Sequence, residues 1–253
     1  MGTDRQRYIL QLLDQKGEVQ LQQLKEHFDG VSMMTLRRDL ISLEKDGRLI
    51  RTYGGAVSTR KLELNGEEDA YSIRASENVE SKMVIAEKAV TLVEKGRSVF
   101  FDSGSTMMSL AKALPDGSYS ILTSGANIAL ELIKRPMITV VTLGGMMNRN
   151  TFSSSGPNAL LALDNMNIDL AFMAASGFSS VNGFSVSNMY ECELKKKVVR
   201  RANKVIMLMD TSKIGKDLAY TYAAFEEIDI WVCEKPLPDD VRSKAEKYGI
   251  QTI

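Results

Sequence analysis

One ten-residue run, Val31–Leu40, constrains the fold of this chain more than any other stretch. It begins with Ser32, a strong helix N-cap, and Val31 before it can pack on the first helical turn. Three leucines then recur at i, i+4 and i+7 and form one apolar stripe: Leu36, Leu40 and Leu43. The same period directs other side chains to the opposite face: Met34, Arg37, Arg38 and Ser42. The run therefore predicts a capped helix with one buried face and two outward arginines.

The segments around this run complete a small domain. A first helix is expected to carry Arg7, Ile9, Leu12 and Leu13 and to stop at Lys16-Gly17. A second has the apolar stripe Leu21, Leu24 and Phe28 and ends at Asp29-Gly30. Residues 47–57 follow the capped helix and have the pattern of a β-ribbon. Three helices and a ribbon predict a winged helix-turn-helix, whose last helix enters the major groove of DNA.

The outward side chains of this unit are the candidate DNA contacts. On the predicted recognition helix they are Ser32, Met34, Thr35, Arg37 and Arg38, and on the wing they are Arg51 and Tyr53. Arginine pairs with the guanine edge and also holds phosphates. The alternative is a winged helix used only for protein contacts, but outward arginines on both recognition helix and wing favour DNA.

These residues also carry a family resemblance. The Ser-x-x-Thr-Leu-Arg-Arg-Asp-Leu run from Ser32 to Leu40, followed by the wing Tyr53-Gly54-Gly55-Ala56, resembles the DeoR family of bacterial transcriptional regulators. The resemblance implies a sequence-specific regulator that binds a double-stranded DNA operator. One departure is visible, because Asp29-Gly30 lengthens the turn before Val31 by about one residue.

Length and charge distribution indicate two domains. A chain of 253 residues is long enough for a small and an average-sized domain. Its formal charge is zero, but residues 1–61 hold 11 Lys and Arg against 8 Asp and Glu. Residues 62–80 hold Arg74 against six acidic residues. We therefore expect a DNA-binding domain at 1–57, an acidic linker at 58–80, and an effector-binding and oligomerisation domain at 81–253 that opens with a helix capped by Ser81.

The larger domain has the pattern of an open, mostly parallel α/β sheet. Short apolar runs separated by helix-like segments occur at residues 98–101, 119–123, 138–143, 169–174, 204–209 and 228–233. Ligands of such sheets bind at the carboxyl ends of the strands. Small and hydroxyl residues gather there, as phosphate binding at helix N-termini requires. The candidate effector residues are Asp102, Ser103, Gly104, Ser105, Thr106, Ser124, Asn127, Gly144, Gly145, Arg149 and Lys213. Ordinary turn chemistry is the alternative for each loop taken alone.

A second resemblance covers this domain. From Ser98 to the C-terminus the chain resembles the DeoR-family sensor domain, itself similar to ribose-5-phosphate isomerase. The isomerase's Gly-Thr-Gly-Ser-Thr phosphate loop is matched by residues 102–106, and a lysine in its Asp-Ser-Ser-Lys run is matched by Lys213. This implies phosphate handling at Ser105, Thr106 and Lys213.

The isomerase's catalytic residues are not matched. Its Asp-Gly-Ala-Asp-Glu run is replaced by residues 173–177, Met-Ala-Ala-Ser-Gly. An ungapped register back from Asp210 places Lys195 at the catalytic glutamate and Val186 at the catalytic lysine. Glu191 and Glu193 lie nearby and can substitute if the register slips. Proton transfer between carbons requires a positioned carboxylate, so we expect binding without catalysis.

The leading hypothesis is a cytoplasmic repressor of a carbohydrate operon, switched by a phosphorylated sugar. It requires no cofactor or metal, and the resemblance implies a homo-oligomer, which we expect to be a homodimer or homotetramer. The sequence has no long apolar run, so we expect no membrane association. A phosphosugar aldose–ketose isomerase carrying a DNA-binding head is one alternative, and an architectural DNA binder is another. We interpret the charge run Lys195, Lys196, Lys197, Arg200 and Arg201 as a solvated helix face. Cys192 and Cys233 are expected to be reduced thiols.

Overall fold

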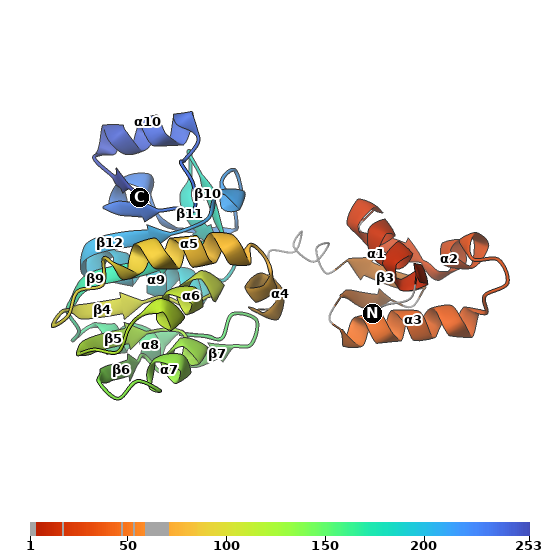
Figure 1. The fold of residues 1–253 in the computed structure, drawn as a ribbon, viewed down its shortest axis with the longest axis horizontal. Coiled ribbons are helices and arrows are strands. Elements are labelled where there is room, and N and C mark those ends of the chain that lie inside the picture. The colour runs from red at the N-terminus through yellow and green to blue at the C-terminus, as the bar shows by residue number, and fades with distance from the viewer. Residues whose placement is uncertain (1–3, 17, 47, 53, 59–70) are drawn as a thin grey trace. The chain divides into compact units, whose positions relative to one another are not determined.

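The chain divides into two compact units, Met1–Asp69 and Ala70–Ile253, in a computed structural model. The structure describes residues 4–16, 18–46, 48–52, 54–58 and 71–253 (Figure 1). Tyr53 of the predicted wing therefore lies outside the described residues, as does most of the predicted linker.

The first unit is the predicted winged helix-turn-helix. Its helices are α1 (Asp4–Lys16), α2 (Leu21–His27) and α3 (Met33–Lys45), and its strands are β1 (Glu18–Gln20), β2 (Leu49–Thr52) and β3 (Gly55–Ser58). The strands form one antiparallel sheet in the order β1-β3-β2. A turn of five residues separates α2 from α3, and Gly30 within it has a φ of +85°. That conformation suits glycine because it has no Cβ.

Helix α3 begins and packs as its sequence predicts. The Ser32 hydroxyl accepts a hydrogen bond from the Thr35 amide at 3.1 Å, which satisfies one N–H of the first turn. The leucine stripe is buried together with Ile9 and Leu13 of α1. Asp39 is also buried, and its carboxylate accepts a bond from Arg5 Nε at 2.8 Å. This ion pair holds α1 against α3 and so sets the position of the recognition helix.

The second unit is built on a seven-stranded, fully parallel sheet in the order β15-β14-β12-β9-β4-β5-β6. Its strands are β4 (Ser98–Phe101), β5 (Tyr119–Thr123), β6 (Ile138–Thr142), β9 (Ile168–Ala174), β12 (Ala202–Leu208), β14 (Ile230–Val232) and β15 (Gln251–Thr252). The first six correspond to the six apolar runs, which confirms the predicted α/β class.

Helices cover both faces of this sheet (Figure 1). One face packs against α5 (Val79–Val90), α6 (Ser105–Ala113) and α7 (Ala126–Leu132). The other packs against α8 (Pro157–Leu163), α9 (Met189–Arg201) and α10 (Asp239–Tyr248). Along β4, Val99 and Phe101 enter the first layer and Phe100 enters the second. Burial on both faces explains why the strand sequences are continuously apolar.

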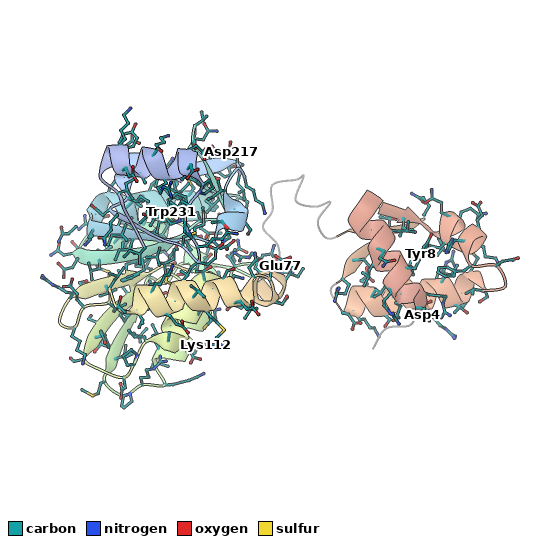
Figure 2. The ribbon with its side chains drawn as sticks, turned by 45° about the horizontal axis from the view of Figure 1, so that its top comes forward. Asp4, Tyr8, Glu77, Lys112, Asp217 and Trp231 are labelled. Carbon is teal, nitrogen blue, oxygen red and sulfur yellow. The ribbon has the colours of Figure 1, made fainter. Side chains whose placement is uncertain are left out.

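Short elements that the sequence did not predict extend the second layer. Strands β10 (Gly177–Ser179), β11 (Gly183–Val186) and β13 (Tyr220–Ala223) form an antiparallel sheet, and β7 (Met146–Asn148) pairs with β8 (Ser153–Ser155). Phe178 and Phe184 of the small sheet contact Trp231, with ring centroids at 4.9 and 5.1 Å. Trp231 is labelled in Figure 2. These strands mix apolar residues with glycine, serine, threonine or asparagine, or consist of serine alone, so they lack the continuous apolar run that marked strands as short as β4 and β14.

One further expectation is corrected. The predicted cap Ser81 lies inside α5, which starts at Val79 after Asn78, a residue with a φ of +48°. Asparagine tolerates this left-handed conformation, so the helix begins earlier. Helix α4 (Tyr71–Ser76) precedes α5 and lies in the second part of the segment 58–80. Within the described ranges, no helix is both long and apolar enough to span a bilayer.

Candidate functional site

The predicted DNA contacts of α3 lie on one exposed surface. Arg37, Arg38 and Met34 are exposed, the last at 58% of its surface, while the leucine stripe faces the core. Thr35 is half-buried, and its hydroxyl lies 2.9 Å from that of Ser32. Ser32 therefore caps the helix, and the exposed side of α3 is left to two arginines and a methionine.

The wing arginine has a partner within the first unit. Arg51 Nε donates to Glu44 Oε2 at 2.6 Å, and its backbone N–H donates to Glu44 Oε1 at 3.0 Å. The hydrogen bonds from Arg51 lower the pKa of Glu44. The Arg51–Glu44 ion pair links strand β2 of the wing to the end of α3. Because both side chains remain partly exposed, the guanidinium can also reach a phosphate.

The topology of the large sheet defines a second candidate site. Chain order runs outward from β4 to β5 and β6 in one direction, and from β9 to β12, β14 and β15 in the other. The crossovers therefore reverse between β4 and β9. Ligands of open α/β sheets bind outside the carboxyl ends of the strands at such a switch point. A ligand of this sheet is therefore expected next to the residues that follow β4 and β9.

A buried ion pair lies at this switch point. Lys195 of α9 donates through Nζ to Asp102 Oδ2, directly after β4, and to the Ala174 carbonyl at 2.9 Å. The Asp102 carboxylate also accepts from the backbone N–H groups of Ser103 at 2.8 Å and Ala174 at 3.0 Å. Asp102 and Lys195 are 1% and 2% exposed. The interpretation of Lys195 as part of a solvated face is therefore wrong, since α9 turns it towards the strand ends.

Two further side chains complete this polar centre. Glu191, one turn before Lys195, has Oε1 3.6 Å from its Nζ and accepts a bond from Ser103 Oγ at 3.4 Å. The Tyr222 hydroxyl donates to the Ala174 carbonyl at 3.0 Å, and its ring centroid lies 5.3 Å from Lys195 Nζ. Of the two carboxylates left open by the sequence, Glu191 is therefore at the site, whereas Glu193 is exposed elsewhere.

The loop after Asp102 has the form of an anion cradle. Gly104 has a φ of +111° and precedes α6, and space is open beside its Cα. Ser105 and Thr106 occupy the first turn of α6, where backbone N–H groups have no partner within the helix. These donors and the helix dipole favour a bound anion. The Asp102 carboxylate accepts the N–H groups of Ser103 and Ala174 and so shapes the loop.

The predicted residues after β5 lie beside this loop. Ser124 is buried, and its hydroxyl lies 3.5 Å from Asp102 Oδ1. Both polar atoms of the Asn127 amide are buried and form no hydrogen bond of normal geometry with the described residues. Burial raises the pKa of Tyr71, and an interaction with the Asn127 amide partly opposes that rise. An amide with unsatisfied polar atoms is suited to a polar ligand.

Lys213 is placed on the other side of the switch point. It ends the short 3-10 helix η2 (Thr211–Lys213), and its Nζ donates to the Ala175 carbonyl at 2.9 Å. The neighbouring carbonyl, of Ala174, receives Lys195. Two lysines thus flank the end of β9, one buried and one half-buried. Lys213 Nζ also lies 4.0 Å from Asp210 Oδ2, at the end of β12.

The remaining predicted residues belong to the β7–β8 hairpin region. Gly145 has a φ of +99°, and a Cβ there would lie 2.5 Å from the Ser155 carbonyl, so only glycine fits. Gly144 and Arg149 are exposed. Ser154 donates from its backbone N–H to the Ser124 carbonyl at 2.7 Å, which attaches the hairpin to the site. Sequence reasoning missed the buried hydroxyls of Thr151, Ser153, Ser154 and Ser155.

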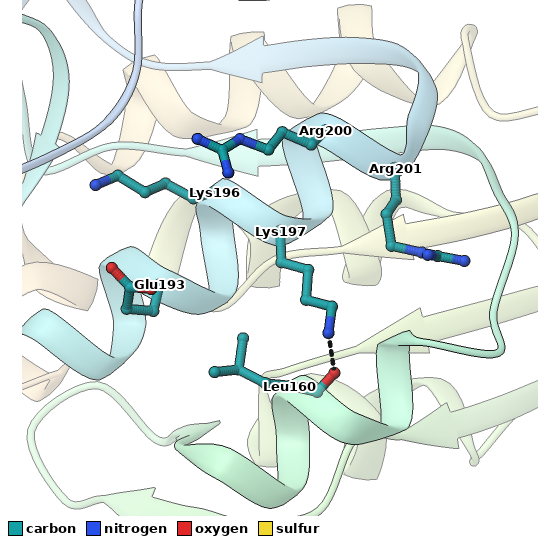
Figure 3. A pocket seen from close by; sticks show the side chains of 6 residues that line it. All are labelled: Leu160, Glu193, Lys196, Lys197, Arg200 and Arg201. Carbon is teal, nitrogen blue, oxygen red and sulfur yellow. Dashed lines mark hydrogen bonds between the residues drawn. The ribbon is translucent and has the colours of Figure 1, made fainter.

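The rest of the charge run lines a groove of about 360 Å³ between α8 and α9 (Figure 3). Lys197 Nζ donates to the Leu160 carbonyl at 2.7 Å, and two nitrogens of Arg201 donate to the Met166 carbonyl at 3.1 and 2.8 Å. These cations bind the last carbonyls of α8 and the turn after it, where helix ends need donors. Arg200 is exposed, as expected for a solvated face.

A winged helix-turn-helix joined to a parallel α/β unit with a polar site at its switch point defines a DNA-binding regulator with a ligand sensor. The profile described as DeoR-like helix-turn-helix domain matches residues 5–61, and that of the DeoR C terminal sensor domain matches residues 77–235. The chain belongs to the DeoR family of transcriptional regulators.

Three relatives illustrate the match. The HTH-type transcriptional regulator GolR of Listeria innocua is 33% identical over 98% of this chain and 96% of its own length. The HTH-type transcriptional regulator GlpR of Haloferax volcanii is 32% identical over 100% of this chain and 98% of its own length. The L-fucose operon activator of Haemophilus influenzae is 27% identical over 98% of both chains.

Among solved structures, ribose 5-phosphate isomerase A of Methanocaldococcus jannaschii is 21% identical. It aligns with a TM-score of 0.42 over 56% of this chain and 57% of its own. A score of this size carries no conclusion about chemistry. The relatives are named as regulators, so the chain is a regulator and the isomerase alternative is not favoured.

Proposed function

We propose that this protein represses a carbohydrate-metabolism operon and leaves its operator when a phosphorylated sugar binds at the switch point of the second unit. The single observation that carries the effector assignment is the convergence of the α6 N-terminus, the buried Asn127 amide and Lys213 on adjoining strand ends. Helix N–H groups, an amide and one cation are the groups that proteins use for phosphate esters.

Each predicted effector residue has a place in this proposal. Ser105, Thr106 and Lys213 hold the phosphate, and Ser103 and Gly104 shape its loop together with Asp102. Ser124 and Asn127 contact the sugar or the phosphate. Gly144, Gly145 and Arg149 belong to the hairpin side of the site and bind sugar hydroxyls.

The operator contacts follow from the exposed surface of α3. Arg37 and Arg38 read bases or hold flanking phosphates, Thr35 and Met34 support them, and Ser32 caps the helix. Arg51 and Tyr53 hold the DNA backbone. We propose a homodimer or homotetramer acting in the cytoplasm, because two copies of one recognition helix match the two half-sites of a palindromic operator.

A thermal-shift screen tests the effector class. The full-length protein is heated with glucose 6-phosphate, fructose 1-phosphate, ribose 5-phosphate and glycerol 3-phosphate, and with the unphosphorylated sugars. A phosphorylated compound that binds the native state raises the melting temperature by mass action. The same compound should weaken binding to a duplex selected from random DNA. If no phosphorylated compound shifts the melting temperature at millimolar concentration, the proposed effector class is wrong.

A further inference from the structure

Helix α4 is the first described element of the second unit, and its side chains contact the hairpin side of the effector site. The Tyr71 ring packs on Phe152, with centroids 5.1 Å apart, and the nearby Asn127 amide partly opposes the rise in the Tyr71 pKa that burial causes. Arg74 Nη2 donates to the Asn150 carbonyl at 3.3 Å. Helix α4 thus contacts the turn between β7 and β8, next to the predicted effector residue Arg149.

Lys82 of α5 forms hydrogen bonds with the C-terminal end of α4. Its side chain is buried, at 4% exposure, and its Nζ donates to the carbonyls of Arg74 and Glu77, the latter at 2.5 Å. These carbonyls lie at and just after the last turn of α4, where no intrahelical donor is available. A single buried ammonium therefore binds the end of α4. Figure 2 labels Glu77 at this junction.

The α4–α5 junction also contacts the Lys213 loop. Asn78, between the two helices, donates through Nδ2 to Ser212 Oγ at 3.1 Å. The pKa of Lys82 is lowered to about 8, mainly by burial and also by the charge of Lys213, while the charges of Asp210 and Glu77 oppose this shift. The ammonium that binds α4 is thus close enough to Lys213 to be repelled by it.

We propose that α4 is a wall of the effector site and reports its occupancy: a phosphate bound at Lys213 strengthens the contacts of Lys82 with the end of α4. This rests on the proposed function. The physical reason is linkage, because an anion beside Lys213 offsets the repulsion between the two lysines and favours charged Lys82. Charged Lys82 donates to the Arg74 and Glu77 carbonyls more strongly than neutral Lys82. Bound phosphate therefore holds α4 more tightly.

Hydrogen–deuterium exchange on the full-length protein tests this inference, with inorganic phosphate as the probe. In the wild type at pH 8.5, above the lowered pKa of Lys82, 10 mM phosphate should slow exchange of residues 71–78 by roughly three-fold or more, along with residues 103–107. In Lys82→Met, residues 71–78 should exchange fast with and without phosphate, while residues 103–107 still respond. Lys88→Met is the matched control, because Lys88 lies on α5 and donates to the Cys233 carbonyl at 2.7 Å. It should behave as the wild type does.

A second variant tests the inference if Lys82→Met does not fold. Asn78→Gly keeps the left-handed conformation, so the protein should fold. It removes the bond to Ser212, which links the α4–α5 junction to the Lys213 loop, so at least half of the phosphate effect at residues 71–78 should be lost. If phosphate protects residues 103–107 in the wild type but leaves 71–78 unchanged, α4 does not report occupancy, and the effector site stands. If neither segment responds to phosphate or to any phosphorylated sugar of the screen, the proposed function fails and this inference fails with it.

Discussion

Lys195 and Asp102 form a buried ion pair, although they lie 93 positions apart in the chain. The pair joins α9 to the end of β4 at the one place in the large sheet where the crossovers reverse. Further polar groups contact its two side chains, among them the Ser103 and Ala174 N–H groups, the Ser124 hydroxyl, the Ala174 carbonyl and the Glu191 carboxylate. A carboxylate with these hydrogen bonds shapes the loop of the proposed effector site and holds it in place.

Breaking this pair should destabilise the second unit strongly. Lys195→Met or Asp102→Asn each removes one charge and leaves the other buried, at an expected cost of about 3–5 kcal/mol in the free energy of unfolding. The double variant should cost less than the sum, since neither charge remains. Urea denaturation measures all three. Lys134→Ala, which breaks an exposed pair with Glu131, should cost under about 1 kcal/mol. Additive losses in the double variant would contradict this coupling.

Operator recognition should depend on the exposed face of α3. Arg37→Ala and Arg38→Ala should each weaken binding to a selected operator by about 1–3 kcal/mol if they read bases. Fluorescence anisotropy against the operator and a scrambled duplex measures the effect. Arg97→Ala, an exposed arginine of the second unit, is the control and should change nothing. If operator affinity survives both α3 substitutions, the recognition surface has been misassigned.

The wing should act differently from the recognition helix. Arg51→Ala should weaken all DNA sequences alike and flatten the salt dependence of binding, because a phosphate contact releases counterions. Glu44→Gln provides the comparison, since it disrupts the Arg51 ion pair but keeps the guanidinium. It should leave the salt slope unchanged. A sequence-selective loss in Arg51→Ala would instead show that the wing reads bases.

The effector response should depend on Lys213 and Ser105. The double variant Lys213→Ala, Ser105→Ala should bind the operator normally and lose its response to the phosphorylated sugar found by the screen. A coupling of about 1–3 kcal/mol between two ligands is typical, so the wild-type response should be five-fold or more in DNA affinity. Titration of DNA affinity against sugar phosphate measures it. The exposed pair Lys216→Ala, Ser120→Ala is the control. A normal response in the first variant would mean that the effector binds elsewhere.

The free energy of unfolding should contain a contribution from Lys82 that changes with pH. The pKa of Lys82 is lowered from 10.5 to about 8 in the folded protein, mainly by burial and also by the charges of Lys213 and Arg74, against the opposing charges of Asp210 and Glu77. Between these two pH values the unfolded chain holds a proton that the native protein has released, so stability rises with pH. The difference between wild type and Lys82→Met, followed by guanidinium unfolding, should grow from pH 8 to pH 10. A constant difference would contradict a lowered pKa.

Both cysteines should be inert in the native protein. Burial is the largest cause that raises the pKa of Cys233, to about 12, and it also raises that of Cys192. Alkylation requires the thiolate, which is scarce for such thiols at pH 8. Mass spectrometry after iodoacetamide treatment should find neither thiol modified without denaturant and both modified in 8 M urea. Rapid native labelling at Cys192 or Cys233 would show that the surrounding core opens readily.

Much of the fold was predictable because its signals are local. The leucine stripe of α3, its Ser32 cap and the six apolar runs of the large sheet each depend on residues a few positions apart. Hydrophobic period and capping act over such distances. The loop at residues 102–106 was found for the same reason, since its small and hydroxyl residues directly follow a strand.

The organisation of the site was decided by the tertiary structure. By itself, the sequence determined the winged helix, the parallel α/β class and the polar strand ends. It did not determine that Lys195 is buried, because a lysine within a charge run looks like its exposed neighbour Arg200 until strand order turns it towards Asp102. Nor did it show that Lys82 binds the end of α4. Burial and pairing of such charges depend on which strands and helices meet, and that is a property of long-range packing rather than of local sequence.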